Sequence, residues 1–404
     1  MATVFDYLDW RGDLDFTCAP FCEVDNLILS FLSYLDFSGL VLEGDTVGLP
    51  LERLAPLYFS HHPRRSGGLG LLIPDRLYDL LEDAASSRRF GCVRLWGHRN
   101  KLDEGRQLQF SATTFTLGCG QSFVAFRGTD DTIVGWKEDF NMAVDFPVPA
   151  QEEARAYLTF VSSRTADRLL LGGHSKGGNL AIYAAAFSPP EVQHRIDAVW
   201  SNDGPGFRKE TLAHPGYRAI RHKVCSLLPR SSVVGVLLHS DPEPIPVESS
   251  AVGALQHDGL TWQVLGPAFV RAETFSRSSR QVEKTFHSLL EEMEPEQRRS
   301  LIDDVFSATR ELGRKPCPTW WLTAKSGRVS ERSPASSQGW RRRPGRACSG
   351  PSAPLSGTRR TGRRKLSDRL SLAALDSSPF SGEPFFLIRK YLPIPCNISH
   401  FMVS

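Results

Sequence analysis

The sequence lacks the features that would tie the chain to a membrane or to secretion. No apolar run reaches the ~18 residues that a membrane-spanning helix needs. The first residues, MATVFDYLDWRGDLDF, carry acidic side chains where a signal peptide would need a basic segment and then an apolar one. We therefore expect a soluble, non-secreted protein that is located in the cytoplasm.

Cysteine is scarce and scattered. The chain has eight cysteines among 404 residues. Cys18 and Cys22 lie close together, but no nearby histidine or second cysteine pair completes a zinc-binding pattern. We expect reduced thiols in place of disulfides, and the sequence implies no metal and no organic cofactor.

Basic residues are concentrated at the C-terminus. The formal net charge is only +3, yet residues 313–404 hold 17 Lys and Arg against 4 Asp and Glu. This segment is rich in Ser, Pro and Gly and cannot bury enough apolar surface to offset its ordering entropy. We predict a folded domain over 1–312, with a helical and hairpin extension over about 1–105, and a disordered basic tail over 313–404. The tail could contact anionic surfaces, and no specific nucleic-acid partner is predicted.

Strand and helix patterns alternate along the predicted domain. RLLLGG is a short apolar run of the kind found in buried parallel strands, and the segments around it have helical spacing. The alternation predicts an α/β fold with a mostly parallel, doubly wound sheet and flanking helices. We expect helices at 23–37, 72–87, 150–165, 175–188 and 279–312, two strands within 107–129, and further strands at 168–173, 197–203, 222–229 and 244–250.

The stretch LLLGGHSKGGNLAIYAAA places Ser175 between Gly173 and Gly177. A phosphate-binding loop would need Lys and then Ser or Thr after its second glycine, and here glycine and asparagine follow. A nucleophile elbow needs glycine two residues to either side of its serine, with a strand before and a helix after. Both flanks are predicted, so we expect Ser175 to be a nucleophile and the two glycines to form its elbow.

A serine nucleophile needs a general base, which in this architecture follows an acid along the chain. His257 lies in a glycine-flanked loop after the last predicted strand and is the preferred base, with His239 as the alternative. Asp203, in SNDGPGF, ends the strand after the elbow helix and is the preferred acid. Asp241, Asp258 and the absence of any acid remain open.

An oxyanion site should combine the backbone N–H after the nucleophile with one from an earlier strand end. These positions are Lys176 and Thr129, which follows the apolar strand pattern of FVAFRG. We expect the Lys176 side chain to be solvated. The alternative is that it steers an acidic substrate headgroup.

Two segments together resemble a known family. FVAFRGTDDTIVGWKEDFNM followed by GGHSKGGNLAIYAA is similar to the class 3 (fungal-type) lipases of the α/β-hydrolase superfamily. YLDWRGDL, NDGPGF and SVVGVLL with QHD and a later Trp resemble more closely a bacterial subfamily of lipase-like hydrolases with poorly defined substrates, over roughly residues 1–310. The resemblance implies an α/β-hydrolase fold, with Ser175 as the nucleophile, Thr129 as the oxyanion residue and His257 as the histidine.

The acid departs from the lipase pattern, because the lipase aspartate would fall near Ser231 or Ser232. The sequence predicts a serine hydrolase that cleaves a carboxylic ester or related acyl bond of a small-molecule or lipid substrate. The missing aspartate motivates the alternative of a weak or inactive hydrolase-fold protein with a binding or regulatory role. The sequence leaves the oligomeric state open.

Overall fold

The structure is a computed structural model that describes residues 1–62, 74, 76–129, 138, 141–142, 146–294 and 296–297. The predicted tail, 313–404, lies outside the described residues, so the boundary at 312 remains a prediction. Within the described residues, no helix is both long enough and apolar enough to cross a membrane.

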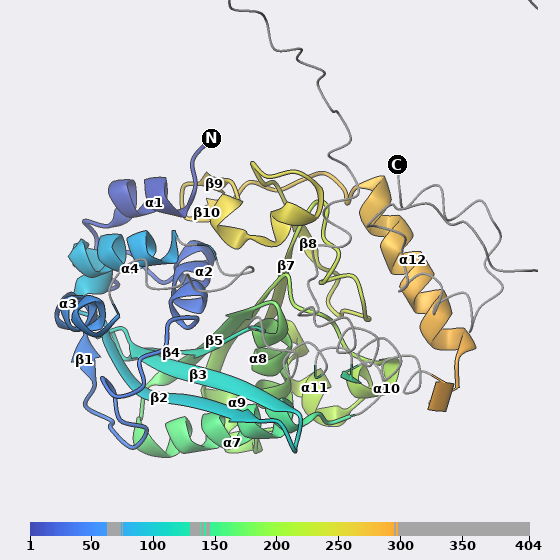
Figure 1. The fold of residues 1–404 in the computed structure, drawn as a ribbon, viewed down its shortest axis with the longest axis horizontal. Helices are drawn as coiled ribbons and strands as arrows, with labels where there is room; N and C mark the ends of the chain where they lie inside the picture. The colour runs from blue at the N-terminus through green and yellow to red at the C-terminus, as the bar shows by residue number, and fades with distance from the viewer. Residues whose placement is uncertain are drawn as a thin grey trace, which may run out of the picture.

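One sheet organises the described chain, and its eight strands lie side by side in chain order (Figure 1). Strands β1 to β4 pair antiparallel, whereas β4 to β8 pair parallel. The predicted mostly parallel α/β sheet is confirmed, although the long strand β2 was not singled out in the sequence. The strands are β1 Leu49–Pro50, β2 Arg94–Asp103, β3 Leu108–Thr116, β4 Gln121–Phe126, β5 Arg168–His174, β6 Ile196–Asn202, β7 Val224–Pro229 and β8 Ile245–Val247.

Helices cover both faces of this sheet. The helix expected over 279–312 is observed as α12, which spans Arg277–Glu292. Beyond α12, the structure describes only residues 293–294 and 296–297 of that range. A two-stranded hairpin, β9 Val264–Leu265 with β10 Ala268–Phe269, follows the main sheet. The helices are α1 Val4–Arg11, α2 Glu23–Leu32, α3 Leu51–His61, α4 Leu77–Ser86, α5 Arg88–Gly91, α7 Pro149–Arg164, α8 Lys176–Ala186, α9 Pro190–Arg195, α10 Lys209–Leu212, α11 Pro215–Ile220 and α12 Arg277–Glu292.

The side chains of β4 alternate between two hydrophobic cores. Phe123 and Ala125 belong to the core built with α1 to α4, whereas Val124 and Phe126 belong to the core built with α7 and α8. Successive strand side chains point to opposite faces of a sheet, so this alternation buries both faces. The N-terminal helices therefore form one of the two covering layers (Figure 1).

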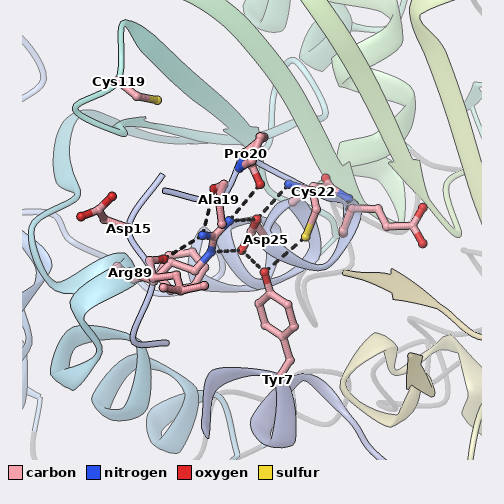
Figure 2. A network of polar contacts seen from close by, with 12 residues as sticks. Tyr7, Asp15, Ala19, Pro20, Cys22, Asp25, Arg89 and Cys119 are labelled. Atoms are coloured by element: carbon pink, nitrogen blue, oxygen red, sulfur yellow. Dashed lines mark hydrogen bonds and ion pairs between the residues drawn. The ribbon is translucent and has the colours of Figure 1, made fainter. Parts of the chain in front are cut away.

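A fully buried ion pair fastens that N-terminal layer. Arg89 Nε and Nη2 donate to the two carboxylate oxygens of Asp25 at 2.7 and 2.6 Å, and neither side chain is exposed (Figure 2). The guanidinium group has five N–H donors, and all five have acceptors here. The remaining donors reach the carbonyl oxygens of Leu14, Ala19 and Pro20.

The Asp25 carboxylate also joins α1 to α2. The Tyr7 hydroxyl donates to it at 2.8 Å, and the Cys22 backbone N–H donates to it at 2.8 Å. Burial, with the nearby Asp25 charge, raises the pKa of the Cys22 thiol to about 12. Cys22 is therefore a protonated thiol at neutral pH, inside a network in which both charges are compensated.

Replacing Arg89 by Met leaves the Asp25 carboxylate buried without its cation. We expect the free energy of unfolding to fall by about 3–5 kcal/mol, as for other buried ion pairs that lose one partner. Arg88 is the matched control, because it pairs with Asp15 at the surface and its side chain is 68% exposed. Urea unfolding followed by circular dichroism should show a large loss for Arg89→Met and little change for Arg88→Met. Equal losses would contradict this account.

Candidate active site

A sharp turn joins β5 to α8, and Ser175 occupies it. Its backbone has φ 57° and ψ −133°, outside the regions that most side chains adopt. Among the described residues, only Gln107, Ser175 and Asp203 are non-glycine residues with left-handed φ. Such strain costs about 1–3 kcal/mol and is typical of functional sites. Two of the three strained positions are thus residues that the sequence singled out.

Neither glycine of the turn has room for a side chain. A Cβ at Gly177 would overlap the carbonyl oxygen of Phe126, at the end of β4. A Cβ at Gly173 would overlap the Gly177 backbone and lie 2.5 Å from the same Phe126 oxygen. The three segments β4, β5 and α8 therefore meet backbone to backbone at the serine.

The end of β6 holds this turn in place. The Ser175 N–H donates to the Asn202 carbonyl at 2.9 Å, and the Asn202 side-chain amide donates to the Gly173 carbonyl at 3.1 Å. Asn26 of α2 exchanges amide hydrogen bonds with Asn202 at 2.9 and 3.2 Å. The Ser175 side chain does not cap α8 and is 9% exposed. Its hydroxyl thus stands at the positive end of a helix, where negative charge is stabilised.

His257 and Asp203 meet beside the turn. His257 Nδ1 lies 2.7 Å from Asp203 Oδ2, although 54 residues separate the two in the chain. Asp203 is 1% exposed and directly follows β6, while His257 ends the 3₁₀ helix Gly253–His257 and is about a quarter exposed. A Cβ at Gly204 would lie 2.6 Å from the Ser175 carbonyl, so the loop after Asp203 abuts the serine.

The second oxygen of Asp203 is held by the loop after β7. Ser232 Oγ donates to Oδ1 at 2.5 Å, and the Gly235 N–H donates to it at 3.2 Å. The Asp203 N–H in turn donates to the Leu227 carbonyl at 2.8 Å. Ser232 is one of the two serines near which the resemblance would place the lipase aspartate, and here it donates to a carboxylate that follows the preceding strand β6.

The other acid and base candidates have different partners. Asp241 forms a surface ion pair with Arg221 at 2.5 Å. Asp258 accepts the Leu260 N–H at 3.0 Å, and burial raises its pKa. The ring of His239 packs against that of His287, with centroids 4.3 Å apart.

Two residues of the QHD and Trp pattern, to which the sequence assigned no role, fix the His257 loop. Gln256 accepts the Ser231 N–H at 2.8 Å through its side chain, and its carbonyl accepts the indole N–H of Trp262 at 2.8 Å. Trp262 is completely buried. The QHD motif and its following Trp therefore form a loop that is anchored on both sides of the histidine.

The two predicted oxyanion positions flank the elbow. Lys176 is the first residue of α8, directly after Ser175. Thr129 is buried and follows β4 by three residues. A Cβ at the intervening Gly128 would lie 2.6 Å from the His174 carbonyl, so this strand end packs against the turn.

The expectation for the Lys176 side chain is wrong. The side chain is buried, and its Nζ donates to the Gln109 carbonyl at 2.9 Å and to the Gln109 side chain at 2.6 Å. Its ion-pair partner is the equally buried Glu138, with Nζ and Oε2 3.1 Å apart. Lys176 is therefore neither solvated nor able to steer a headgroup, because its charge is compensated inside the protein.

Within the described residues, no group of three or more His, Cys, Asp and Glu side chains could hold a metal ion.

The fold and the strand–serine–helix turn define a lipase-like α/β-hydrolase. The model of the Mbeg1-like family matches residues 84–307, and the chain belongs to this lipase-like family. No curated protein matches the chain.

Several solved lipase structures are similar to the chain at low identity. The M37 lipase has 14% identity and a TM-score of 0.34, with 54% of this chain and 70% of that chain covered. The Lip2 lipase of Yarrowia lipolytica has 12% identity and a TM-score of 0.32, with 56% and 77% covered. A fungal lipase–inhibitor complex has 12% identity and a TM-score of 0.34, with 69% and 88% covered.

Replacing Lys176 by Met should leave the Glu138 carboxylate buried without a cation. We expect the free energy of unfolding to fall by about 3–5 kcal/mol. The double variant Lys176→Met with Glu138→Gln removes both charges, keeps an oxygen acceptor for the backbone N–H groups that Glu138 binds, and should recover much of that loss. Urea unfolding of the two variants measures the difference. A double variant less stable than Lys176→Met would count against the ion pair as the cause.

Proposed function

We propose that the protein is a serine hydrolase that cleaves a carboxylic ester or a related acyl bond. The observation that carries this proposal is the 2.7 Å contact between His257 Nδ1 and Asp203 Oδ2, next to the strained Ser175 turn. A nucleophile, a base and a group that orients the base are the parts that acyl transfer through serine requires.

The proposed reaction begins with attack of Ser175 Oγ on the substrate carbonyl carbon. His257 takes the hydroxyl proton through Nε2, because its Nδ1–H is directed at Asp203. The same proton passes to the leaving alcohol as the tetrahedral intermediate collapses to an acyl-enzyme. Water then attacks the acyl carbon, with His257 as its base, and Ser175 is regenerated.

The negative charge of the intermediate is assigned to two backbone donors. In this proposal the N–H groups of Lys176 and Thr129 receive the oxyanion, assisted by the N-terminal end of α8. The buried ion pair of Lys176 with Glu138 supports this role, because it fixes the residue whose N–H is needed.

Asp203 takes the role of the acid in this account. Ser232 and the Gly235 N–H occupy its second oxygen, so the carboxylate is held by two donors in addition to the histidine. The absence of an aspartate at Ser231 or Ser232 is therefore no reason to prefer a binding or regulatory protein over an enzyme.

The substrate is proposed as a small-molecule or lipid ester, which family membership supports without specifying an acyl chain. A cytoplasmic location, and contact of the basic segment 313–404 with anionic surfaces, remain predictions from the sequence.

Ser175→Ala should abolish hydrolysis of p-nitrophenyl esters. We expect a loss of at least about a thousandfold in kcat, because the variant lacks the nucleophile. The measurement compares both proteins on a series from acetate to palmitate, with labelling by a fluorophosphonate probe in parallel. A wild-type protein that is neither active nor labelled would favour the binding or regulatory alternative.

Asp203→Asn should lower kcat by about 10⁴, because the amide no longer holds His257 in the required tautomer. Asp241→Asn is the matched control, since Asp241 is a surface partner of Arg221. Steady-state kinetics on the best ester of the series separates the two variants. If Asp241→Asn were the damaging change, Asp203 would not be the acid.

A further inference from the structure

His174, between the elbow glycine and the serine, contacts the loop of the proposed base. It is the last residue of β5 and is 5% exposed. Its Nε2 lies 2.7 Å from the backbone carbonyl oxygen of His257, and its Nδ1 lies 2.9 Å from the hydroxyl of Tyr34. One imidazole thus bridges the strand of the nucleophile, the histidine loop and the N-terminal layer.

The hydrogen bonds fix the tautomer of His174. A carbonyl oxygen only accepts, so Nε2 must carry the hydrogen and donate it to His257. In the neutral ring Nδ1 is then an acceptor, and the Tyr34 O–H donates to it. Burial is the main cause that lowers the pKa of His174 well below its ordinary value, and the nearby charge of His257 lowers it further. His174 is therefore a neutral imidazole with one defined tautomer.

Ring contacts hold His174 from both sides. Its ring centroid lies 4.5 Å from that of His257 and 4.7 Å from that of Phe31. Phe31 lies on α2 and Tyr34 follows that helix by two residues. Both precede residue 84, where the match to the family begins.

We propose that Tyr34 and His174 are positioning residues that set the distance between His257 and Ser175. This inference rests on the proposed function. The Asp203 contact orients the imidazole ring of His257, whereas the His174 contact holds its main chain. His174 directly precedes Ser175 in the chain. Its hydrogen bond to the His257 carbonyl therefore links the main chain of the proposed base to the residue before the proposed nucleophile, although 83 residues separate the two histidines.

The neutral state of His174 serves the same reaction. His257 becomes an imidazolium ion when it takes the serine proton. A second positive imidazole with its ring centroid 4.5 Å away would oppose that charge. The His257 carbonyl fixes the tautomer of His174, and the Tyr34 hydroxyl donates to the remaining lone pair at Nδ1. In this proposal only His257 exchanges a proton during the cycle.

The direct test is the rate at which a fluorophosphonate probe modifies Ser175. His174→Leu removes the donor to the His257 carbonyl, and we expect a rate about 100-fold lower, as for a misplaced catalytic group. Tyr34→Phe removes only the hydroxyl and should slow the reaction about tenfold. His174→Gln keeps an N–H donor and should recover part of the rate lost in His174→Leu.

Tyr157→Phe is the matched control, because it removes a buried hydroxyl that forms a hydrogen bond with Thr114 Oγ1 of β3. It should label at the wild-type rate. Thermal unfolding is measured for every variant, so that a rate is interpreted only for folded protein. Wild-type rates for both His174→Leu and Tyr34→Phe would overturn the proposal.

¹⁵N NMR of the wild-type protein with labelled histidine measures the tautomer and the titration of His174. This test does not depend on hydrolytic activity. We expect the His174 signals of a neutral Nε2–H tautomer, unchanged between about pH 5 and 8. Titration within that range, or an Nδ1–H tautomer, would overturn the proposal. A wild-type protein with the expected His174 signals and no labelling of Ser175 would instead contradict the proposed function alone.

Discussion

The site depends on a close approach between the backbones of β4 and α8. The Phe126 carbonyl, at the end of β4, lies against Gly177 so closely that no Cβ fits between them. This approach brings β4, β5 and α8 together and leaves Ser175 in a strained conformation at the start of the helix. The strain is held by packed backbone on several sides, which is the condition under which such conformations persist. The close approach therefore places Ser175 at the start of α8, where the residue is only 9% exposed.

The N-terminal layer belongs to the site as much as to the core. The Asp25–Arg89 pair fixes α2 against the rest of that layer. Asn26 of α2 forms a hydrogen bond with Asn202, which binds the elbow. Tyr34, just after α2, forms a hydrogen bond with His174. Residues that precede the family match thus touch the groups that hold the serine and the proposed base. The residue range that looks like an extension in the sequence therefore packs against the candidate active site and supports it.

The sequence predicted most reliably what depends on neighbours in the chain. The Ser175 turn could be recognised because the strand, two glycines and helix that create it are contiguous. The burial of Lys176 could not, because its partner Glu138 lies 38 residues earlier and only the fold brings them together. The hydrogen bond from Ser232 to Asp203 could not be predicted for the same reason, because the two residues are 29 positions apart and only the fold brings them together. Strand β2 is hard to recognise in the sequence, because residues 95–98 are all buried and therefore show no alternation of buried and exposed side chains.

A crystal structure of the protein after reaction with a fluorophosphonate would test the central claim most directly. The account predicts phosphorus bound to Ser175 Oγ and a phosphoryl oxygen that accepts hydrogen bonds from the N–H groups of Lys176 and Thr129. It also predicts that His257 Nε2 lies within hydrogen-bond distance of a phosphonate oxygen while Nδ1 keeps its contact with Asp203. A phosphonate attached to another residue, or a phosphoryl oxygen directed away from both N–H groups, would contradict it.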